Sequence, residues 1–131
     1  MIKIGFTGTR DISKVSKERL QKLWEVMLDY KIFINVEVIH GGAKGADEYF
    51  HNICVEHMTS IKIRWAYVVR ELKGIYEEYP PEPPLSRNKK IVDDCDVLIA
   101  LPIDPNKEEV RSGTWSTIRY ARKQNKQIII I

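Results

Sequence analysis

The chain has 131 residues, of which 44% are hydrophobic, and carries a formal net charge of +3. This length suits one domain spanning residues 1–131, which can bury a core without disulfides. So small a net charge excludes any inference of a nucleic acid or membrane partner from composition alone. Cys54 and Cys95 lack zinc-type spacing, so we expect two buried free thiols and neither a metal nor a cofactor.

No apolar stretch approaches the length of about 18 residues that a membrane helix needs. The first apolar run, Ile2–Phe6, is typical of a strand and not of a signal peptide. We therefore expect a cytoplasmic protein without a membrane partner.

Strand and helix patterns alternate along the first third of the chain. Ile2–Phe6 predicts a strand, followed by a helix in which apolar residues recur at helical spacing from Leu20 to Leu28. Ser13 or Ser16 is the expected cap of this helix. The β-branched run Val36–His40 predicts the second strand.

The middle of the chain contains one irregular segment. Helical spacing from 46 to 57 predicts a helix, and the alternation of Ile61–Ala66 predicts a third strand. Residues 67–85 include the proline-rich stretch Tyr76–Pro84, which cannot form a helix interior or a central strand. This stretch is either a semi-rigid crossing loop or a lid over a site. Ser86–Asp94 then predicts a short helix capped by Ser86.

The last third returns to regular alternation. Asp96–Leu101 is almost continuously apolar, as expected of a central parallel strand covered on both faces. A polar loop at 103–111 precedes a helix over Trp115–Lys123 and a final strand over Gln127–Ile131. The pattern predicts an α/β fold: a single Rossmann-like three-layer domain with a mainly parallel five-stranded sheet.

Three predicted strands run into loops rich in glycine or hydroxyl residues. If the first strand lies between the second and the fourth, all three loops meet at the carboxyl edge of the sheet, where ligands bind in such folds. There the loop N–H groups, Arg10 and Lys44 would surround one anion, which predicts a phosphate-bearing ligand. Any one of these loops alone could equally be a tight turn that only connects a strand to a helix. Neither GxxxxGK[ST] nor GxGxxG occurs, which argues against ATP hydrolysis and hydride transfer.

Four pieces of sequence carry a family resemblance: Gly8–Arg10; Gly41–Asp47; Arg87–Asn88; and Asp96–Ala100 with Ser112–Thr114. On these pieces the chain resembles the SLOG superfamily. This Rossmann-like group includes the LOG nucleotide phosphoribohydrolases, DprA-type proteins and the YspA/YpsA-related families. The resemblance implies a pocket for nucleotides or nucleotide-derived ligands at these loops, and a homo-oligomer as the assembled form.

Arg10, Lys44 and Arg87 are therefore expected to point into one pocket with the amides of Gly113 and Thr114. The expected ligand-binding residues are Gly8, Thr9, Arg10, Gly41, Gly42, Ala43, Lys44, Gly45, Asp47, Arg87, Asn88, Pro102, Ser112, Gly113 and Thr114.

The resemblance also bears on catalysis. In LOG-type enzymes a PGGxGTxxE motif supplies a glutamate, and an upstream arginine assists cleavage of a base–ribose bond. Arg87 stands where that arginine would be, but Gly113–Thr114 is followed by Trp115–Ile118 with no glutamate. Asp47 and Glu48 are the substitute carboxylates, because glycosidic hydrolysis needs one to activate water or to stabilise the cationic sugar. Asp47 also suits the helix dipole, which is a structural role.

Three functional interpretations follow. The first is a binding module for a nucleotide-derived ligand, such as an ADP-ribose-like or cyclic nucleotide signal. The second is a nucleotide N-glycosidic hydrolase, which the missing glutamate disfavours. The third is a nucleic-acid-binding protein, which is not expected because no dense basic stripe is interleaved with aromatic residues.

Overall fold

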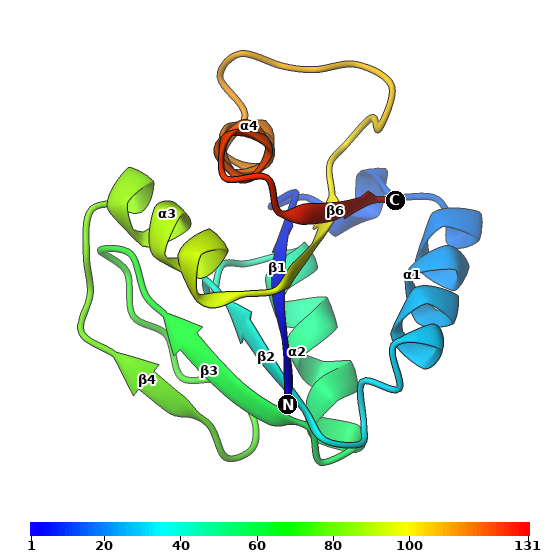
Figure 1. Cartoon of the computed structure of the whole chain (residues 1–131), viewed down its shortest axis with the longest axis vertical. Helices are drawn as coiled ribbons and strands as arrows, with labels where there is room; N and C mark the ends of the chain where they lie inside the picture. The colour runs from blue at the N-terminus through cyan, green and yellow to red at the C-terminus, as the bar shows by residue number, and fades with distance from the viewer.

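Six strands form one sheet in the order β4-β3-β2-β1-β5-β6, and every neighbouring pair is parallel. The computed structural model describes residues 1–131 (Figure 1). The strands are β1 (Ile2–Gly8), β2 (Val36–His40), β3 (Ser60–Arg64), β4 (Glu77–Tyr79), β5 (Val97–Leu101) and β6 (Gln127–Ile130). The helices are the 3₁₀ turn η1 (Ile12–Lys14), α1 (Lys17–Asp29), α2 (Ala46–Glu56), α3 (Pro84–Asp94) and α4 (Gly113–Lys123).

The Rossmann-like α/β fold expected from the sequence is confirmed, with β1 flanked by β2 and β5. The sheet has six strands where five were expected, because β4 forms within the proline-rich segment. It has only three residues and pairs with β3 alone, at the edge of the sheet. An edge strand needs hydrogen bonds on one side only, so prolines beside it are tolerated. Such a short strand leaves no periodic signal in the sequence.

Helices cover both faces of the sheet (Figure 1). On one face, α1 and α2 contribute Leu23 and Phe50 to the largest apolar cluster, which includes Ile4 from β1. On the other face, Val92 of α3 packs against Leu98 of β5 in a second cluster. The β5 strand is buried along its whole length, as expected of a strand with helices on both sides.

Local chemistry sets the helix starts. Ser16 caps α1 as expected, since its side chain accepts a hydrogen bond from the Arg19 N–H. The α3 helix begins at Pro84, with Pro83 in the cap position, and not at the expected Ser86 cap. Proline suits the first helical position because its fixed φ is already helical and because an N–H there would have no partner within the helix.

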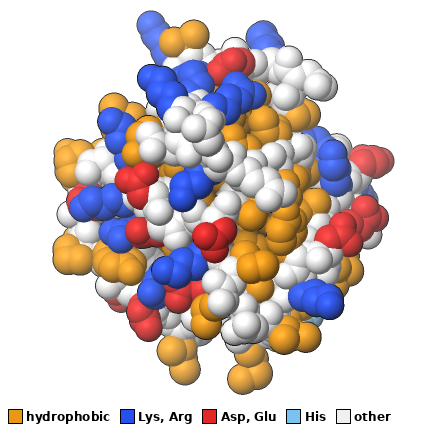
Figure 2. Space-filling model, in the orientation of Figure 1, with side chains coloured by type: hydrophobic (Ala, Val, Ile, Leu, Met, Phe, Trp, Pro, Cys, Tyr) orange, Lys and Arg blue, Asp and Glu red, His pale blue; other side chains and the backbone are white.

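The surface carries mixed charge. On the face shown in Figure 2, Lys and Arg side chains gather at the end of the molecule where Figure 1 places α4 and the loop before it. Cys54 and Cys95 are buried free thiols, as expected. None of the helices combines the length and the apolar character needed to cross a bilayer.

Candidate functional site

A cavity of about 630 Å³ opens at the carboxyl edge of the sheet. Its walls come from the loops after β1, β2 and β5 and from the first turns of α3 and α4. The lining residues are Phe6, Thr7, Gly8, Thr9, Arg10, Asp11, Gly41, Ala43, Asp47, Pro84, Leu85, Arg87, Asn88, Ile91, Ile103, Glu109, Arg111, Ser112, Gly113, Thr114 and Trp115.

Backbone hydrogen bonds hold the loops together. The Thr9 N–H donates to the Leu101 carbonyl at 2.9 Å, and the Thr9 carbonyl accepts from the Ala46 N–H at 2.9 Å. Gly45 has φ +85°, and a Cβ there would lie 2.3 Å from the Arg10 carbonyl oxygen. Both the backbone conformation and the close approach therefore require glycine at this position.

Arg87 fixes the loop after β2 from the opposite side. It is 7% exposed, and its Nη1 group donates to the carbonyls of Gly41 at 2.7 Å and Arg64 at 3.1 Å. Its Nε donates to Asn88 Oδ1 at 2.8 Å, whereas Nη2 makes no hydrogen bond within the chain. Burial lowers the pKa of Arg87, and nearby Asp47 opposes this effect. Arg87 therefore holds the loop through Nη1 and Nε, and its Nη2 group has no partner within the chain.

Asp47 presents a buried carboxylate beside Arg87. Its Oδ2 accepts hydrogen bonds from the N–H groups of Gly41 at 3.2 Å and Ala43 at 3.3 Å. Its Oδ1 is buried and has no partner. Burial raises the pKa of Asp47 to about 6, although Arg87 and the two backbone donors pull it down. A buried acceptor without a partner is rare in native proteins, and Asp47 is the one residue of the cavity lining that has such an atom.

The N-terminus of α4 forms another wall of the cavity. Ser112 is its cap, and its Oγ accepts from the Trp115 N–H at 3.2 Å. The Gly113 and Thr114 N–H groups make no hydrogen bond within the chain, and both residues line the cavity. A Cβ at Gly113 would meet no atom within 4 Å. Free N–H groups at an open helix N-terminus attract anions.

The structure gathers eleven of the fifteen expected binding residues around this cavity. The other four are Gly42, Lys44, Gly45 and Pro102. Lys44 is exposed and outside the lining, so it does not share the pocket with Arg10 and Arg87 as expected.

Three of these four residues, Gly42, Gly45 and Pro102, have structural roles elsewhere. Gly42 has φ +67° and packs under Trp65, whose ring would lie 2.3 Å from an added Cβ. The carbonyl of Pro102 accepts a hydrogen bond from Arg19. The candidate acid Glu48 is also outside the cavity and pairs with Arg70 at 2.9 Å. Glycine and charge signals in a loop therefore did not distinguish the residues that shape the loop from those that line the cavity.

Sequence reasoning missed part of the wall. Arg111 and Ile103 reach the cavity from the polar loop before α4, and Leu85 and Trp115 come from the first turns of α3 and α4. A lone arginine in a charged loop carries no signal of direction. Trp115, however, directly follows the expected Gly113–Thr114 pair, and this position could have indicated a role.

A parallel sheet of this order, with a cavity at its carboxyl edge, defines a Rossmann-like α/β domain. Three solved structures have this fold. The chain superposes on DNA processing protein A (DprA) from Streptococcus pneumoniae with a TM-score of 0.70 and 18% identity, covering 98% of this chain and 50% of that one. On DprA from Helicobacter pylori it superposes with a TM-score of 0.64 and 18% identity, covering 98% of this chain and 64% of that one. On TM1055, a structural genomics target, it superposes with a TM-score of 0.68 and 16% identity, covering 98% of this chain and 72% of that one.

The chain thus spans half to about two thirds of the DprA chains. These likenesses confirm the fold. No protein-family model and no curated protein matches the chain. The Helicobacter pylori structure concerns single-stranded DNA binding by that protein. The expectation that nucleic acid is not a partner therefore has no support from the comparisons.

Proposed function

We propose that the cavity binds a nucleotide or a nucleotide-derived small molecule, such as an ADP-ribose-like or cyclic nucleotide signal. One observation carries the proposal: a single cavity is lined both by the residues whose N–H groups are free at the start of α4 and by Asp47, a buried carboxylate with one oxygen that lacks a donor. Gly113, Thr114, Arg10 and Arg111 suit a phosphate. Asp47 suits a sugar hydroxyl, which a bare inorganic anion cannot supply.

The remaining wall suits a flat apolar group. Trp115, Leu85, Ile91 and Ile103 all line the cavity, and its volume of about 630 Å³ lies within the usual range for small-molecule pockets. A phosphate, a sugar hydroxyl and a base would then each have a matching partner.

A thermal-shift panel tests the proposal, because a ligand that binds only the folded state raises the melting temperature. The panel holds nucleoside phosphates, ADP-ribose, cyclic nucleotides, the matching nucleosides and inorganic phosphate. Phosphorylated nucleosides should raise the melting temperature, whereas nucleosides and phosphate alone should do so far less. A panel in which inorganic phosphate matches every nucleotide would contradict the role given to Asp47.

Two variants and a control locate the binding. Arg111→Gln and Asp47→Asn should each weaken a phosphorylated ligand roughly 10- to 100-fold, the usual effect of losing a hydrogen bond to a charged group. Lys14→Gln also removes one exposed positive charge, but outside the cavity, and should leave affinity unchanged. Equal losses in Arg111→Gln and Lys14→Gln, with no loss in Asp47→Asn, would point to general charge and not to this cavity.

N-glycosidic hydrolysis is the second candidate, and the raised pKa of Asp47 favours it. A pKa of about 6 is close to the operating pH, which suits a group that transfers protons. Glu48 is tied to Arg70 outside the cavity, so Asp47 is the stronger acid candidate. Incubation with nucleotides and NAD derivatives should release free base if this activity is present, and Asp47→Asn should abolish the release.

Nucleic acid is a further partner to test, because the fold is similar to that of a DprA whose structure concerns single-stranded DNA binding. Short single-stranded oligonucleotides therefore belong in the same panel. Binding that falls steeply with salt and is unaffected by Asp47→Asn would support nucleic acid over a small molecule.

A further inference from the structure

Two buried histidines connect the Gly41–Ala43 loop to a segment far along the chain. The Gly42 N–H donates to His40 Nδ1 at 2.9 Å, and His40 Nε2 lies 2.9 Å from His51 Nδ1. His51 Nε2 in turn lies 2.7 Å from the Lys73 carbonyl oxygen. Both histidines are 0% exposed, and neither lines the cavity at the carboxyl edge. The function proposed above leaves this pair unused.

These hydrogen bonds allow only one arrangement of protons. Because His40 Nδ1 accepts from a backbone N–H, His40 carries its proton on Nε2 and donates it to His51 Nδ1. His51 Nδ1 is then an acceptor, so its own proton is on Nε2 and is donated to the Lys73 carbonyl. Both rings are neutral in this arrangement. A further proton on either Nδ1 would place two N–H groups face to face and break one of these bonds.

The Lys73 carbonyl belongs to residues 66–76, which run from β3 to β4 along α2 and which we call the strap. No backbone–backbone hydrogen bond joins the strap to the rest of the chain. Side chains hold it instead: Arg70 pairs with Glu48 of α2 at 2.9 Å, and Leu72 is buried in the largest apolar cluster. A segment with so few contacts can open locally without unfolding the rest of the protein.

The strap is linked to both backbone groups of Gly42. Arg70 Nη1 donates to the Gly42 carbonyl at 3.2 Å, and the Gly42 N–H is linked to the strap through the two histidines. Gly41 and Ala43, on either side, line the cavity and donate their N–H groups to Asp47. The position of this wall of the cavity is therefore coupled to the position of the strap.

The surroundings of His40 keep its ring neutral. Burial lowers the pKa of His40 to about 3, and positive charge on His51 of α2 or on Arg87 of α3 acts in the same direction. The Phe50 ring lies edge-on to His40, with the ring centres 6.4 Å apart, and offers no charge to a proton. An added proton therefore enters the pair at the other ring.

His51 is the ring that takes up the proton. Burial lowers its pKa, whereas the Lys73 carbonyl and the Glu48 carboxylate raise it. Glu48 is itself paired with Arg70 of the strap. The ring of Tyr76, also on the strap, lies edge-on to His51 with the ring centres 5.5 Å apart. The added proton goes to His51 Nδ1, which removes the acceptor for His40.

We propose that His40 and His51 form a proton-sensitive latch, which holds the strap on the Gly41–Ala43 loop and opens when the pair takes up one proton. Opening separates the two rings and leaves the Arg70 contact to Gly42 as the one remaining hydrogen bond between strap and loop. The loop, and with it one wall of the cavity, then becomes mobile. The resulting loss of affinity for a ligand rests on the proposed function, whereas the opening itself does not.

Proton linkage gives the pH range in which the latch opens. The closed latch disfavours a charged imidazole, and the open latch binds the proton near the ordinary histidine pKa of 6.5. The latch is therefore closed above pH 6.5. Below this value, the equilibrium constant for opening rises by up to about tenfold per pH unit for one proton taken up.

Hydrogen exchange of the Gly42 amide, followed by NMR without any ligand, measures the opening. Between pH 6.5 and 5 its protection factor should fall about tenfold in the unmodified protein. Low urea should hardly change this exchange, whereas the Ile99 amide of the central strand β5 should show the steep urea dependence of global unfolding. If the Gly42 amide exchanges only as slowly as that of Ile99 at every pH, no local opening exists and the proposal is wrong.

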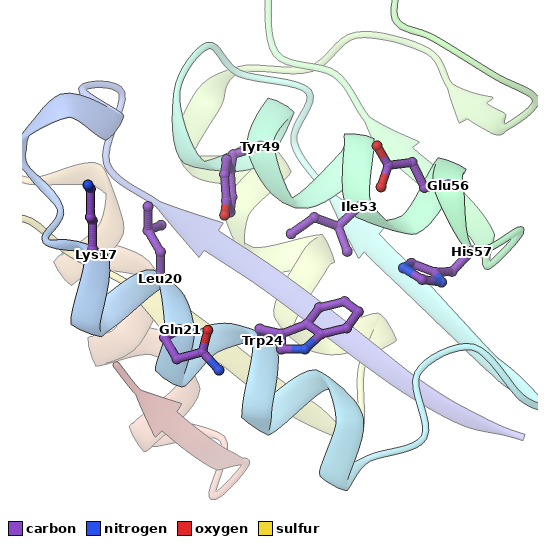
Figure 3. A pocket seen from close by; sticks show the side chains of 8 residues that line it. All are labelled: Lys17, Leu20, Gln21, Trp24, Tyr49, Ile53, Glu56 and His57. Carbon is purple, nitrogen blue, oxygen red and sulfur yellow. The ribbon is translucent and has the colours of Figure 1, made fainter.

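Three variants assign the proton. Glutamine offers one acceptor and one donor, like neutral histidine, but takes up no proton in this range, so His51→Gln should abolish the pH dependence of Gly42 protection. His57→Gln is the matched control, because His57 lies beside Trp24 in the groove between α1 and α2 (Figure 3). It should keep the pH dependence, and so should Asp47→Asn, since Asp47 binds the neighbouring amides but not that of Gly42. A pH dependence that persists in His51→Gln or disappears in Asp47→Asn would overturn the assignment.

Nitrogen NMR of the imidazole rings tests the latch without any variant. Both rings should carry their proton on Nε2 at pH 7, and His51 should titrate in step with the loss of Gly42 protection. A proton on Nδ1 of either ring at neutral pH would contradict the arrangement on which the latch depends.

Calorimetry with ADP-ribose separates the latch from the proposed function. Between pH 6.5 and 5 the affinity should fall several-fold further in the unmodified protein than in His51→Gln, because Asp47 titrates in both. Equal pH profiles in the two proteins would refute the coupling of the latch to the cavity. No binding of ADP-ribose at pH 7 would count against the proposed function, while the exchange measurements would still decide whether the latch exists.

Discussion

Replacing Asp47 by asparagine should stabilise the protein while weakening its ligand. Asp47 is 6% exposed, and burial raises its pKa from 3.8 to about 6. A raised carboxyl pKa means that the folded state disfavours the ionised form. At neutral pH, Asp47 is therefore ionised at a cost to the stability of the fold. Asparagine keeps the shape and an oxygen acceptor for the Gly41 and Ala43 N–H groups without that cost.

The size of the effect follows from the pKa difference. A shift of about two units corresponds to roughly 3 kcal/mol between the two protonation states. This is an upper limit, because the amide NH₂ would occupy the position of Oδ1, where no acceptor is present, and would offset part of the gain. We therefore expect Asp47→Asn to raise the free energy of unfolding by about 1–3 kcal/mol at pH 7.

The contribution of Asp47 to the free energy of unfolding depends on pH in a definite direction. Between pH 3.8 and about 6, folded Asp47 binds more protons than unfolded Asp47, so its contribution to stability falls as the pH rises. Above this window the full cost is present, and below it the cost disappears. The advantage of Asp47→Asn should thus be greatest at pH 7 and should vanish as the pH falls toward 4.

Urea unfolding followed by circular dichroism measures this difference at a series of pH values. Glu71→Gln is the control, because Glu71 is exposed and makes no ion pair or hydrogen bond within the chain. An Asp47→Asn protein less stable than the original at pH 7 would refute the reasoning, and so would an advantage that does not change with pH. Greater stability combined with weaker ligand binding is the trade-off expected of a functional site.

Three further predictions rest on single contacts. Burial lowers the pKa of His40 to about 3 and also lowers that of His51, so these histidines take up protons on unfolding below about pH 6.5. In the Asp47→Asn protein no carboxylate at position 47 opposes this effect, so the free energy of unfolding should fall as the pH drops below that value, as urea titration can measure. Gly45→Val should lower the free energy of unfolding by roughly 3 kcal/mol or more, through its positive φ and its clash with Arg10, whereas Gly113→Ala, which meets no neighbour, should change it by less than about 1 kcal/mol. Arg87→Lys should cost about 2–3 kcal/mol in calorimetry, because the single nitrogen of a lysine cannot replace both the Nη1 contacts to Gly41 and Arg64 and the Nε contact to Asn88. A melting temperature equal to that of the original would show that these contacts are dispensable.

The layout of the fold was readable from the sequence because strands and helices leave strong periodic signals. The run Val97–Leu101 is apolar at every position, and a strand covered on both faces needs this. The glycine and hydroxyl loops marked the carboxyl edge for the same kind of reason, since tight turns restrict residue type. β4 was missed because three residues beside prolines make too short a pattern.

For the candidate site, the sequence predicted which loops meet but not which of their side chains face the cavity. The sequence indicated Gly8–Arg10, Gly41–Asp47 and Ser112–Thr114 as neighbours, and the topology brings them together. It could not show that Lys44 faces away from the cavity or that Arg111 faces into it, because both are exposed loop cations with no periodic restraint. Side-chain direction in a loop depends on contacts made elsewhere in the chain.

The sequence by itself determined the order of the α-helices and of every strand except β4, the buried central strand and the presence of loops suited to an anion, because each of these depends on local backbone geometry and on the spacing of apolar residues. Only the tertiary structure decided that Asp47 is buried with one oxygen unpaired, that Arg87 clamps Gly41, and that a groove separates α1 from α2. Burial, pKa and cavity shape are set by residues far apart in the chain. These properties turn a glycine-rich turn into the candidate site.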